Sequence, residues 1–545
     1  MSAQALALAL AAAATLGCAG GCRGAAGDPF DYYQGQVYKP FFVRSPLASE
    51  ILETRRPVGR ESQSFPLRKA PGSLRVFIVG GSIAQTLDAL DFRPRLTEAL
   101  EKVLPGRTAD VLNCGMSGYD AEREERVFDE VLGYSPDLVV LMSGANEWNT
   151  PLLPRWLAWT CSGPVRRACA AGLGRYQGVR RRIWSPQERQ ADFERTVRRM
   201  ARKAKTRGVS MVLCTVPMSL RDMPPMGRLP LEDGNFFSGW RRFEAGSWRE
   251  AAEEFRTYVE RCPGDAMGHY YLARALDLSG AVGQAREQYL GAQDDDRSIP
   301  LMNEALRRVA RDQGVALADL AALFESAAPD GLPGRALFED DVHWDRRFDP
   351  LVDLAIAKAF TRAAGRPMDA GGARWLARNE AAQLRAARRA KVTREKSWEI
   401  FRIRMWEPLQ TPGNLFSERI VALLETVRMT APGLVAEPAA MKEWLRARLT
   451  GNIWGEDGER RLDAWWPAML GHVGELHRRQ RRPALAVRFF EEALRLDPSL
   501  EKVRLHRALA LAASGDMERA RAEFQGLSSL KDDVVTRRWR GAYGL

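Results

Sequence analysis

Short apolar runs alternate with segments of helical periodicity from residue 74 to residue 363. The apolar runs, which we predict to be strands, are 74–79, 109–112, 137–142, 209–216 and 315–320. The segments with helical spacing of apolar residues are 83–104, 120–133, 186–207, 301–313 and 348–363. Strands that alternate with helices are typical of a parallel sheet with helices on both faces. The pattern therefore predicts a three-layer α/β/α fold with five parallel strands.

A repeat with a period of 34 residues interrupts this pattern and returns near the C-terminus. Gly239 and Phe255 recur as Ala273 and Tyr289, while Pro263 follows Phe255 by eight residues. In the second pair, Gly474, Ala486 and Phe490 recur as Ala508, Ala520 and Phe524. Small residues where two helices cross, with an aromatic residue one turn later, are typical of stacked helical hairpins. This spacing resembles the tetratricopeptide repeat.

The remaining segments complete a predicted domain organisation. Residues 27–73 are polar, rich in aromatic residues and interrupted by prolines, which indicates a linker and an irregular N-terminal arm. Residues 364–465 carry helical patterns rich in Arg, Glu and Ala, and we expect further helical hairpins there. The expected order is a signal segment (1–22), the linker and arm (23–73), the first part of the α/β domain (74–236), inserted repeats (237–296), the second part of the α/β domain (297–363), a helical region (364–465) and C-terminal repeats (466–545).

The N-terminus resembles a bacterial lipoprotein signal. Residues 3–17 form an Ala- and Leu-rich run, which is too short for a membrane span but suits the apolar part of a secretory signal. Small residues followed by a cysteine end this run, so Cys18 is the first candidate for lipid attachment and Cys22 the second. We therefore expect export to the bacterial cell envelope, periplasm or outer membrane, with a lipid anchor at the membrane.

Composition and charge narrow the functional classes. The chain has 545 residues, of which 45% are hydrophobic and 28% charged, as in ordinary globular proteins. Its net charge is +12, but the basic residues are interspersed with acidic ones and no nucleic-acid-reading motif accompanies them. We therefore expect no nucleic-acid partner. The seven cysteines form no CxxC pair, so no zinc site is predicted. Cys161 and Cys169 are spaced to form a disulfide in an exported protein, and two free thiols are the open alternative.

Candidate chemistry gathers where the predicted strands end. Gly80-Gly81-Ser82 follows the first strand, 113–118 (NCGMSG) the second, and 144–147 (GANE) the third. These ends lie on one edge of a parallel sheet, where open α/β folds bind ligands. A serine, glycines that expose backbone N–H groups and an asparagine amide are the parts of a nucleophile beside an oxyanion hole.

A histidine completes the constellation. His343 alone among the five histidines belongs to the α/β segments, and Asp340 precedes it by three residues. An aspartate at that spacing on a loop can turn back to hold the imidazole, which gives a serine triad in the chain order Ser, Asp, His. Asp341 is the alternative partner. No P-loop, dinucleotide motif or metal cluster is visible, so no cofactor and no metal are expected.

These blocks together resemble the SGNH (GDSL-like) hydrolase superfamily over about residues 74–363, apart from the inserted repeats. The resemblance implies a flavodoxin-like sheet with Ser82 as nucleophile, His343 as general base and Asp340 as its partner. It also implies an oxyanion hole built from the Ser82 N–H, Gly118 and the Asn146 side chain. The first block of the family is often Gly-Asp-Ser, whereas Gly81 stands in the place of that Asp here.

The expected function is a serine esterase that acts on O-acyl groups, such as O-acetyl groups, of an extracytoplasmic glycan or lipid. An acyltransferase that uses the same site is an open alternative, because a sugar hydroxyl can replace water. A further alternative is a scaffold that binds protein partners through its repeats, since stacked helical hairpins offer a groove for peptides. Tryptophans and arginines between 148 and 182 are candidates for substrate contacts or for packing (Trp148, Trp156, Trp159, Arg155, Arg166, Arg167 and 180–182).

Overall fold

The computed structural model describes residues 40–54, 63–87, 92–147, 185–222, 225, 234–296, 298–328, 330–363, 368–391, 437–449 and 455–527. These residues divide into two compact units. The first unit comprises residues 1–219 and 297–390, and the second comprises residues 220–296 and 391–545. The predicted signal segment with Cys18 and Cys22, and the Cys161–Cys169 pair, lie outside the described residues, so export, lipid attachment and that disulfide stay predictions.

A five-stranded parallel sheet forms the centre of the first unit. The strands are β4 (Leu74–Gly80), β5 (Ala109–Asn113), β6 (Leu138–Met142), β7 (Ser210–Cys214) and β8 (Ala316–Ala318), in the spatial order β5-β4-β6-β7-β8. Among these five strands, β4 comes first in the chain and lies between β5 and β6, the second and third, which is the flavodoxin-like order. Every residue of β4 and β6 is buried, as expected for strands covered on both faces. The predicted fold class is confirmed.

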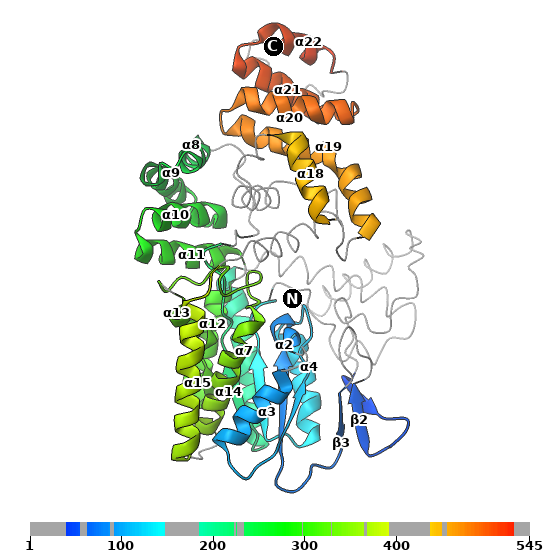
Figure 1. The fold of residues 1–545 in the computed structure, drawn as a ribbon, viewed down its shortest axis with the longest axis vertical. Coiled ribbons are helices and arrows are strands. Elements are labelled where there is room, and N and C mark those ends of the chain that lie inside the picture. Colours follow the sequence, from blue (N-terminus) through cyan, green and yellow to red (C-terminus); the bar gives the residue numbers. More distant parts are fainter. Residues whose placement is uncertain are drawn as a thin grey trace, which may run out of the picture. The chain divides into compact units, whose positions relative to one another are not determined.

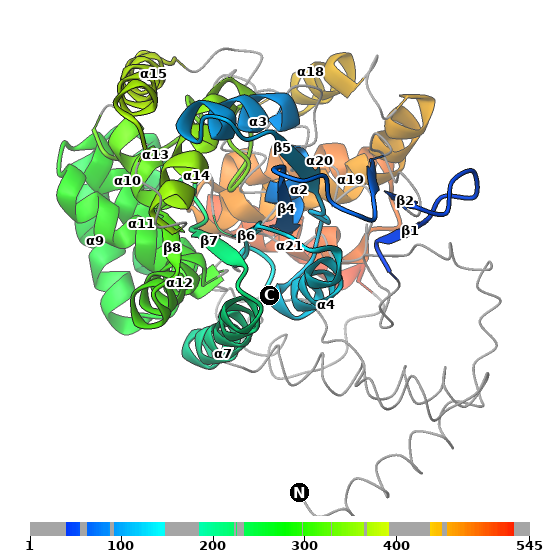
Figure 2. The same cartoon turned by 90° about the horizontal axis from the view of Figure 1, so that it is seen from below.

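Helices cover both faces of this sheet, as Figures 1 and 2 show. One face carries α3 (Phe92–Val103) and α14 (Asp349–Ala363), and the other carries α4 (Ala121–Val131), α7 (Pro186–Thr206) and α12 (Ile299–Gln313). Local signals fix where these helices begin. Ser185 and Glu188 form a capping box at α7, with Pro186 at its first position, and Asp120 caps α4 by accepting from the Arg123 N–H.

The N-terminal arm is more regular than the sequence analysis expects. It forms a small antiparallel sheet of β1 (Phe42–Arg44), β2 (Ile51–Thr54) and β3 (Ser64–Pro66). Phe42 and Phe65 pack edge to face, with their ring centroids 4.9 Å apart, and Phe65 packs on Phe77 of β4 at 5.7 Å. Residues with no clear alternation become strands here because the large sheet offers them an apolar surface.

The helix that follows the α/β segments also differs from the expectation. The residue pattern of 364–465 predicts helical hairpins, but α15 (Ala370–Arg388) packs on α14 and α3 within the first unit. A Cβ on Gly372 would lie 2.8 Å from the carbonyl oxygen of Lys102, so glycine permits this close approach. An ion pair of 2.8 Å joins Lys358 of α14 to Glu380 of α15.

The second unit consists of helices. The inserted segment forms α8 (Gly234–Glu244), α9 (Trp248–Arg261), α10 (Ala266–Leu278) and α11 (Val282–Asp296), and the C-terminal segment forms α18 (Pro438–Leu449), α19 (Gly455–Arg479), α20 (Pro483–Leu496), α21 (Glu501–Ser514) and α22 (Met517–Gln525). Glu244 of the inserted helices forms a 2.6 Å ion pair with Arg482 of the C-terminal helices. These helices are compatible with the predicted repeats, whose assignment as tetratricopeptide repeats stays a prediction. Within the described ranges, no helix is both long and apolar enough to cross a membrane.

The small and aromatic residues that define the 34-residue period meet each other. A Cβ on Gly239 would lie 2.9 Å from Phe255 Cε1, and one on Gly474 would lie 2.7 Å from Phe490 Cε1. Both phenylalanines are fully buried. The spacing seen in the sequence therefore marks helix crossings at which a small residue, here Gly239 or Gly474, packs against an aromatic ring.

We expect Gly474→Val to destabilise the second unit by about 1–3 kcal/mol, because the added atoms must displace the Phe490 ring from a packed core. Urea unfolding followed by circular dichroism measures this change. The matched control is Gly283→Val, at a helical glycine where a Cβ meets nothing within 4 Å. Equal midpoints for the two variants would contradict the crossing.

Candidate active site

Ser82 stands just after the carboxyl end of β4, the strand between β5 and β6, and opens the short helix α2 (Ser82–Thr86). The two glycines before it bring backbones into close contact. A Cβ on Gly80 would lie 2.3 Å from the carbonyl oxygen of Met142 on the neighbouring strand, and Gly81 forms the N-cap of the helix. The sequence predicts this place for Ser82, and the sheet topology positions it at the edge where ligands bind in such folds.

The loop after β5 is tied to the same helix by buried hydrogen bonds. Asn113 donates from Nδ2 to the carbonyl oxygen of Ala84 at 2.7 Å and accepts from the Gly115 N–H at 2.8 Å. The Ser117 N–H donates to Gln85 Oε1 at 2.5 Å. Gly118 follows with a φ of +75°, a backbone conformation that favours glycine. This loop therefore presents its backbone beside the start of α2.

Asn146 joins the third block to these two. Its Nδ2 donates to the carbonyl oxygen of Tyr119 at 3.1 Å, directly after Gly118. A Cβ on Gly81 would lie 2.7 Å from Asn146 Nδ2 and 3.1 Å from Tyr119 O. The structure thus brings Ser82, Gly118 and Asn146 into one neighbourhood. In this backbone geometry a side chain at Gly81 would collide with Asn146.

His343 and Asp340 form a tight pair on the loop between α13 (Leu320–Ala327) and α14. His343 Nδ1 lies 2.6 Å from Asp340 Oδ2, and the His343 backbone N–H donates to Asp340 Oδ1 at 2.7 Å. Each carboxylate oxygen therefore receives one bond from the same histidine. The Asp341 carbonyl oxygen instead accepts from the Ser219 N–H at 2.8 Å, which anchors the loop. Of the two aspartates considered, Asp340 is the one that holds the imidazole.

Electrostatics keep Asp340 ionised. Burial alone would raise the pKa of this carboxyl, but the charge of His343 and the hydrogen bonds from His343 and Val342 outweigh it, so the pKa lies below its ordinary value. An ionised Asp340 accepts the Nδ1 proton, which leaves Nε2 as the basic nitrogen of the imidazole. This is the tautomer that a general base needs.

The site is thus assembled in two groups. Described hydrogen bonds connect α2 with 113–119 and Asn146, and connect His343 with Asp340. That Ser82 and His343 act on one proton stays a prediction. The candidate aromatic and basic residues from Trp148 to 182 lie outside the described residues.

Several residues near the candidate site were not predicted from the sequence to have a role there. Asn113 and Gln85 hold the loop after β5 against α2, and Glu147 accepts from the Ala121 N–H at 3.1 Å. Glu124 of α4 is buried next to Gly81. Asn113 and Glu147 lie inside the quoted blocks, but nothing in the pattern of α4 distinguishes Glu124 from the exposed acidic residues of a helix.

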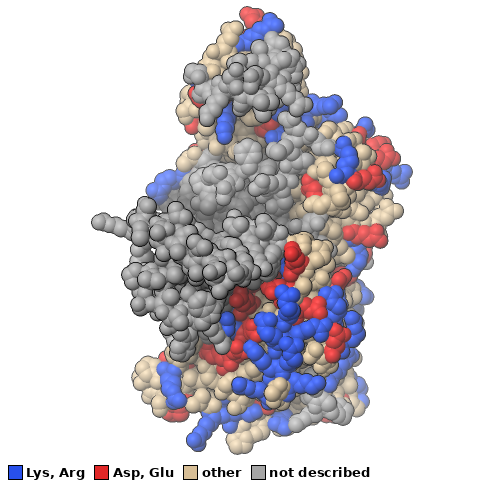
Figure 3. Space-filling model, turned by 180° about the vertical axis from the view of Figure 1, so that it is seen from behind, with Lys and Arg blue, Asp and Glu red and all other residues tan. Residues whose placement is uncertain are grey.

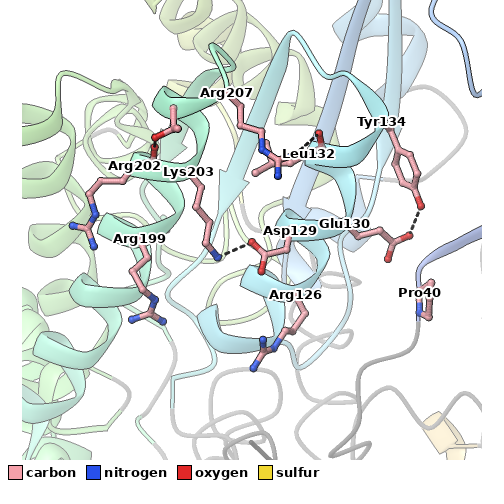
Figure 4. A pocket seen from close by; sticks show the side chains of 11 residues that line it. Pro40, Arg126, Asp129, Glu130, Leu132, Tyr134, Arg199, Arg202, Lys203 and Arg207 are labelled. Carbon is pink, nitrogen blue, oxygen red and sulfur yellow. Dashed lines mark hydrogen bonds and ion pairs between the residues drawn. The ribbon is translucent and has the colours of Figure 1, made fainter. Parts of the chain in front are cut away.

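A cavity of about 1020 Å³ lies elsewhere on the first unit, between the C-terminal halves of α4 and α7. Figure 4 shows it lined by arginines and Lys203 together with Asp129, Glu130 and Tyr134. Lys and Arg side chains also gather on the face seen in Figure 3, with acidic side chains among them. Lys203 pairs with Asp129 at 2.6 Å and Arg199 with Glu125 at 2.8 Å, so these two cations belong to ion pairs between the helices. The cavity contains none of the predicted catalytic residues.

In the part of the chain that the structure describes, no group of three or more His, Cys, Asp or Glu side chains is arranged to hold a metal ion. The cysteines described as free are Cys114, Cys214 and Cys262. Burial raises the pKa of the Cys214 thiol well above its ordinary value. It is therefore no candidate nucleophile.

The chain resembles solved structures only weakly, in both sequence identity and TM-score. An acetylxylan esterase from Geobacillus stearothermophilus, as a catalytic mutant of Axe2, is 15% identical over 55% of this chain and 96% of its own, with a TM-score of 0.29. A lipase/acylhydrolase from Enterococcus faecalis is 14% identical over 55% of this chain and 100% of its own, with a TM-score of 0.26. Similarity at this level says nothing about the substrate of this chain.

A family model matches the segment that carries the candidate site residues. No curated protein sequence matches the chain. Residues 78–347 match the model of the GDSL-like Lipase/Acylhydrolase family, and this span contains Ser82, Gly118, Asn146, Asp340 and His343. Residues 78–347 therefore form a GDSL-like lipase/acylhydrolase domain, an ester-hydrolysing enzyme.

Proposed function

We propose that the chain is a serine esterase with Ser82 as nucleophile, His343 as general base and Asp340 as the residue that orients the base. The observation that carries this proposal is the His343–Asp340 pair, in which both carboxylate oxygens of Asp340 are hydrogen-bonded to His343. Ser82 supports it by its place just after the end of β4, within the matched family span. The Ser82 N–H, the Gly118 N–H and the Asn146 amide are the proposed oxyanion donors.

The proposed reaction has two stages. His343 Nε2 takes the Ser82 hydroxyl proton while Ser82 Oγ attacks the acyl carbon of the ester. The carbonyl oxygen becomes an oxyanion that accepts from the proposed donors, and His343 then gives its proton to the leaving alcohol. Water attacks the acyl-enzyme with His343 again as base, which releases the acid and restores Ser82.

The proposed substrate is an O-acyl ester, such as an O-acetyl ester, of a glycan or lipid outside the cytoplasm. Its support is the predicted signal segment together with the resemblance to exported members of the superfamily. Transfer to a sugar hydroxyl is the alternative that uses the same acyl-enzyme. The two differ in the fate of the acyl group, so a labelled acetyl donor with and without an oligosaccharide acceptor separates them.

Ser82→Ala should lower turnover of nitrophenyl acetate by about 10³-fold or more, because no other hydroxyl takes over the attack. The same variant should lose labelling by a fluorophosphonate, which reacts with activated serines. Both are measured on the purified folded protein, with circular dichroism as the folding check. Full turnover in Ser82→Ala would overturn the proposed nucleophile.

Asp340→Asn should reduce kcat by about 10²- to 10⁴-fold, because an amide cannot hold the Nδ1–H tautomer of His343 as an ionised carboxylate does. The matched control is Asp341→Asn, on the adjacent residue, for which we expect less than about a threefold change. Steady-state kinetics on nitrophenyl acetate compares the two. A greater loss in Asp341→Asn would assign the orienting role to Asp341.

Gly81→Ala should lower kcat by about 10- to 100-fold, because its Cβ would lie 2.7 Å from Asn146 Nδ2 and displace a proposed oxyanion donor. Gly133→Ala serves as the control, since a Cβ there meets nothing within 4 Å. Steady-state kinetics together with the melting temperature separates loss of the site from loss of the fold. A fully active and stable Gly81→Ala would contradict the role of Asn146.

A further inference from the structure

Glu124 lies at the back of the proposed oxyanion hole. It belongs to the first turns of α4, which pack on β4, and only 1% of it is exposed. Its Oε1 is 3.7 Å from the position that a Cβ on Gly81 would take, and that same position is 2.7 Å from Asn146 Nδ2. The carboxyl of Glu124 and the amide of Asn146 therefore surround the same point, directly before Ser82.

The surroundings of Glu124 disfavour a negative charge. The charged groups that face it are Glu147, from the loop after β6, and Asp120, which pairs with Arg123 at 3.0 Å. The Ser143 hydroxyl is the nearby neutral group, and Glu124 Oε2 has no hydrogen-bond partner among the described residues. Burial comes first in raising the pKa of Glu124 well above its ordinary value, and the charges of Glu147 and Asp120 add to it, which together outweigh the lowering effect of the Ser143 hydroxyl.

The next residue in the helix has the opposite environment. Glu125 points towards α7 and forms 2.8 Å ion pairs with Arg199 and Lys203. Burial would raise the pKa of Glu125, but the hydrogen bonds from these two cations outweigh it and lower the pKa. Two adjacent glutamates thus differ in their expected charge, and only the uncharged one adjoins the proposed site.

An ionised Glu124 would interfere with the oxyanion donor. Asn146 Nδ2 carries two N–H groups, and one of them donates to Tyr119 O at 3.1 Å. The second N–H is the one proposed to meet the oxyanion. A carboxylate at Glu124, whose Oε1 lies 3.7 Å from the Cβ position of Gly81, would repel the developing negative charge in a buried, weakly screened region.

We infer that Glu124 is a positioning residue of the active site that works as an uncharged acid, and that acylation slows when Glu124 loses its proton. This inference rests on the proposed serine esterase function. No covalent step is added to the reaction, because Glu124 acts through Asn146 and Gly81 and does not touch the reacting atoms.

The test compares the pH profile of kcat/KM for nitrophenyl acetate in three proteins. The wild type should lose about tenfold or more on the alkaline side as Glu124 ionises. Glu124→Gln stays uncharged and of equal shape, so it should keep its activity there. Glu125→Gln removes the same charge from the neighbouring position and should retain the alkaline loss. An alkaline loss that persists unchanged in Glu124→Gln overturns the inference.

Melting temperature against pH gives a readout without activity. A carboxyl whose pKa is raised in the folded state binds more protons there, so it costs stability as pH rises above its unfolded pKa of about 4.3. The advantage of Glu124→Gln over the wild type should therefore grow with pH above that value. Glu125 has a lowered pKa, so the Glu125→Gln variant should fall below the wild type over the same range. A difference for Glu124→Gln that does not change with pH contradicts the uncharged state.

Two further variants keep the outcomes distinct. Glu124→Met is also uncharged and of similar volume, and it should likewise lack the alkaline loss if Glu124→Gln fails to fold. Ser82→Ala tests the proposed function itself. If Ser82→Ala remains active, the esterase proposal fails whatever the profile of Glu124→Gln. If Ser82→Ala is inactive and the profile is unchanged, only the role of Glu124 fails.

Discussion

Close contact between three backbone segments at the carboxyl edge of the sheet is the constraint on which the site depends. The end of β4 passes so near to β6 that a Cβ on Gly80 would overlap the Met142 carbonyl oxygen. The loop after β5 approaches equally closely, since a Cβ on Gly115 would lie 2.4 Å from the Gln85 backbone nitrogen. Glycine at these positions lets backbone N–H groups and the Asn146 amide gather around the start of α2. A site of this kind is made by the absence of side chains as much as by their presence.

Several carboxyl groups near the candidate site residues are partly or fully buried, and they differ in whether a hydrogen-bond donor or cation stabilises their negative charge. Asp120 caps α4 and pairs with Arg123, while Glu147 accepts from the Ala121 N–H. In the second group of candidate site residues, Asp340 accepts two hydrogen bonds from His343. Each of these acids has donors for its charge. Glu124 differs because carboxylates face it and its Oε2 has no hydrogen-bond donor among the described residues, so the protonated form costs less free energy than the charged form.

In the second unit, packing between helices depends on small residues that face aromatic rings. Its helices cross where a glycine meets an aromatic ring, as Gly239 meets Phe255 and Gly474 meets Phe490. The inserted and C-terminal helices lie far apart in the chain, yet Glu244 and Arg482 connect them within one unit. A chain that leaves its sheet after β7 and returns before β8 can build such a unit because each helical hairpin packs mainly on its neighbours.

The alternation of strands and helices, the 34-residue period and the motifs around Ser82, Asn146 and His343 can all be found in the sequence alone. These features are local, since burial on two faces, helix crossings and tight turns each leave a pattern in adjacent residues. Tertiary structure decided which aspartate holds His343, because Asp340 and Asp341 differ only in how the loop turns. It also decided that the N-terminal arm forms strands and that α15 joins the first unit, since both depend on surfaces supplied by distant segments. The environment of Glu124 was beyond the sequence for the same reason: the groups that surround it come from three separate loops, and only folding brings them together.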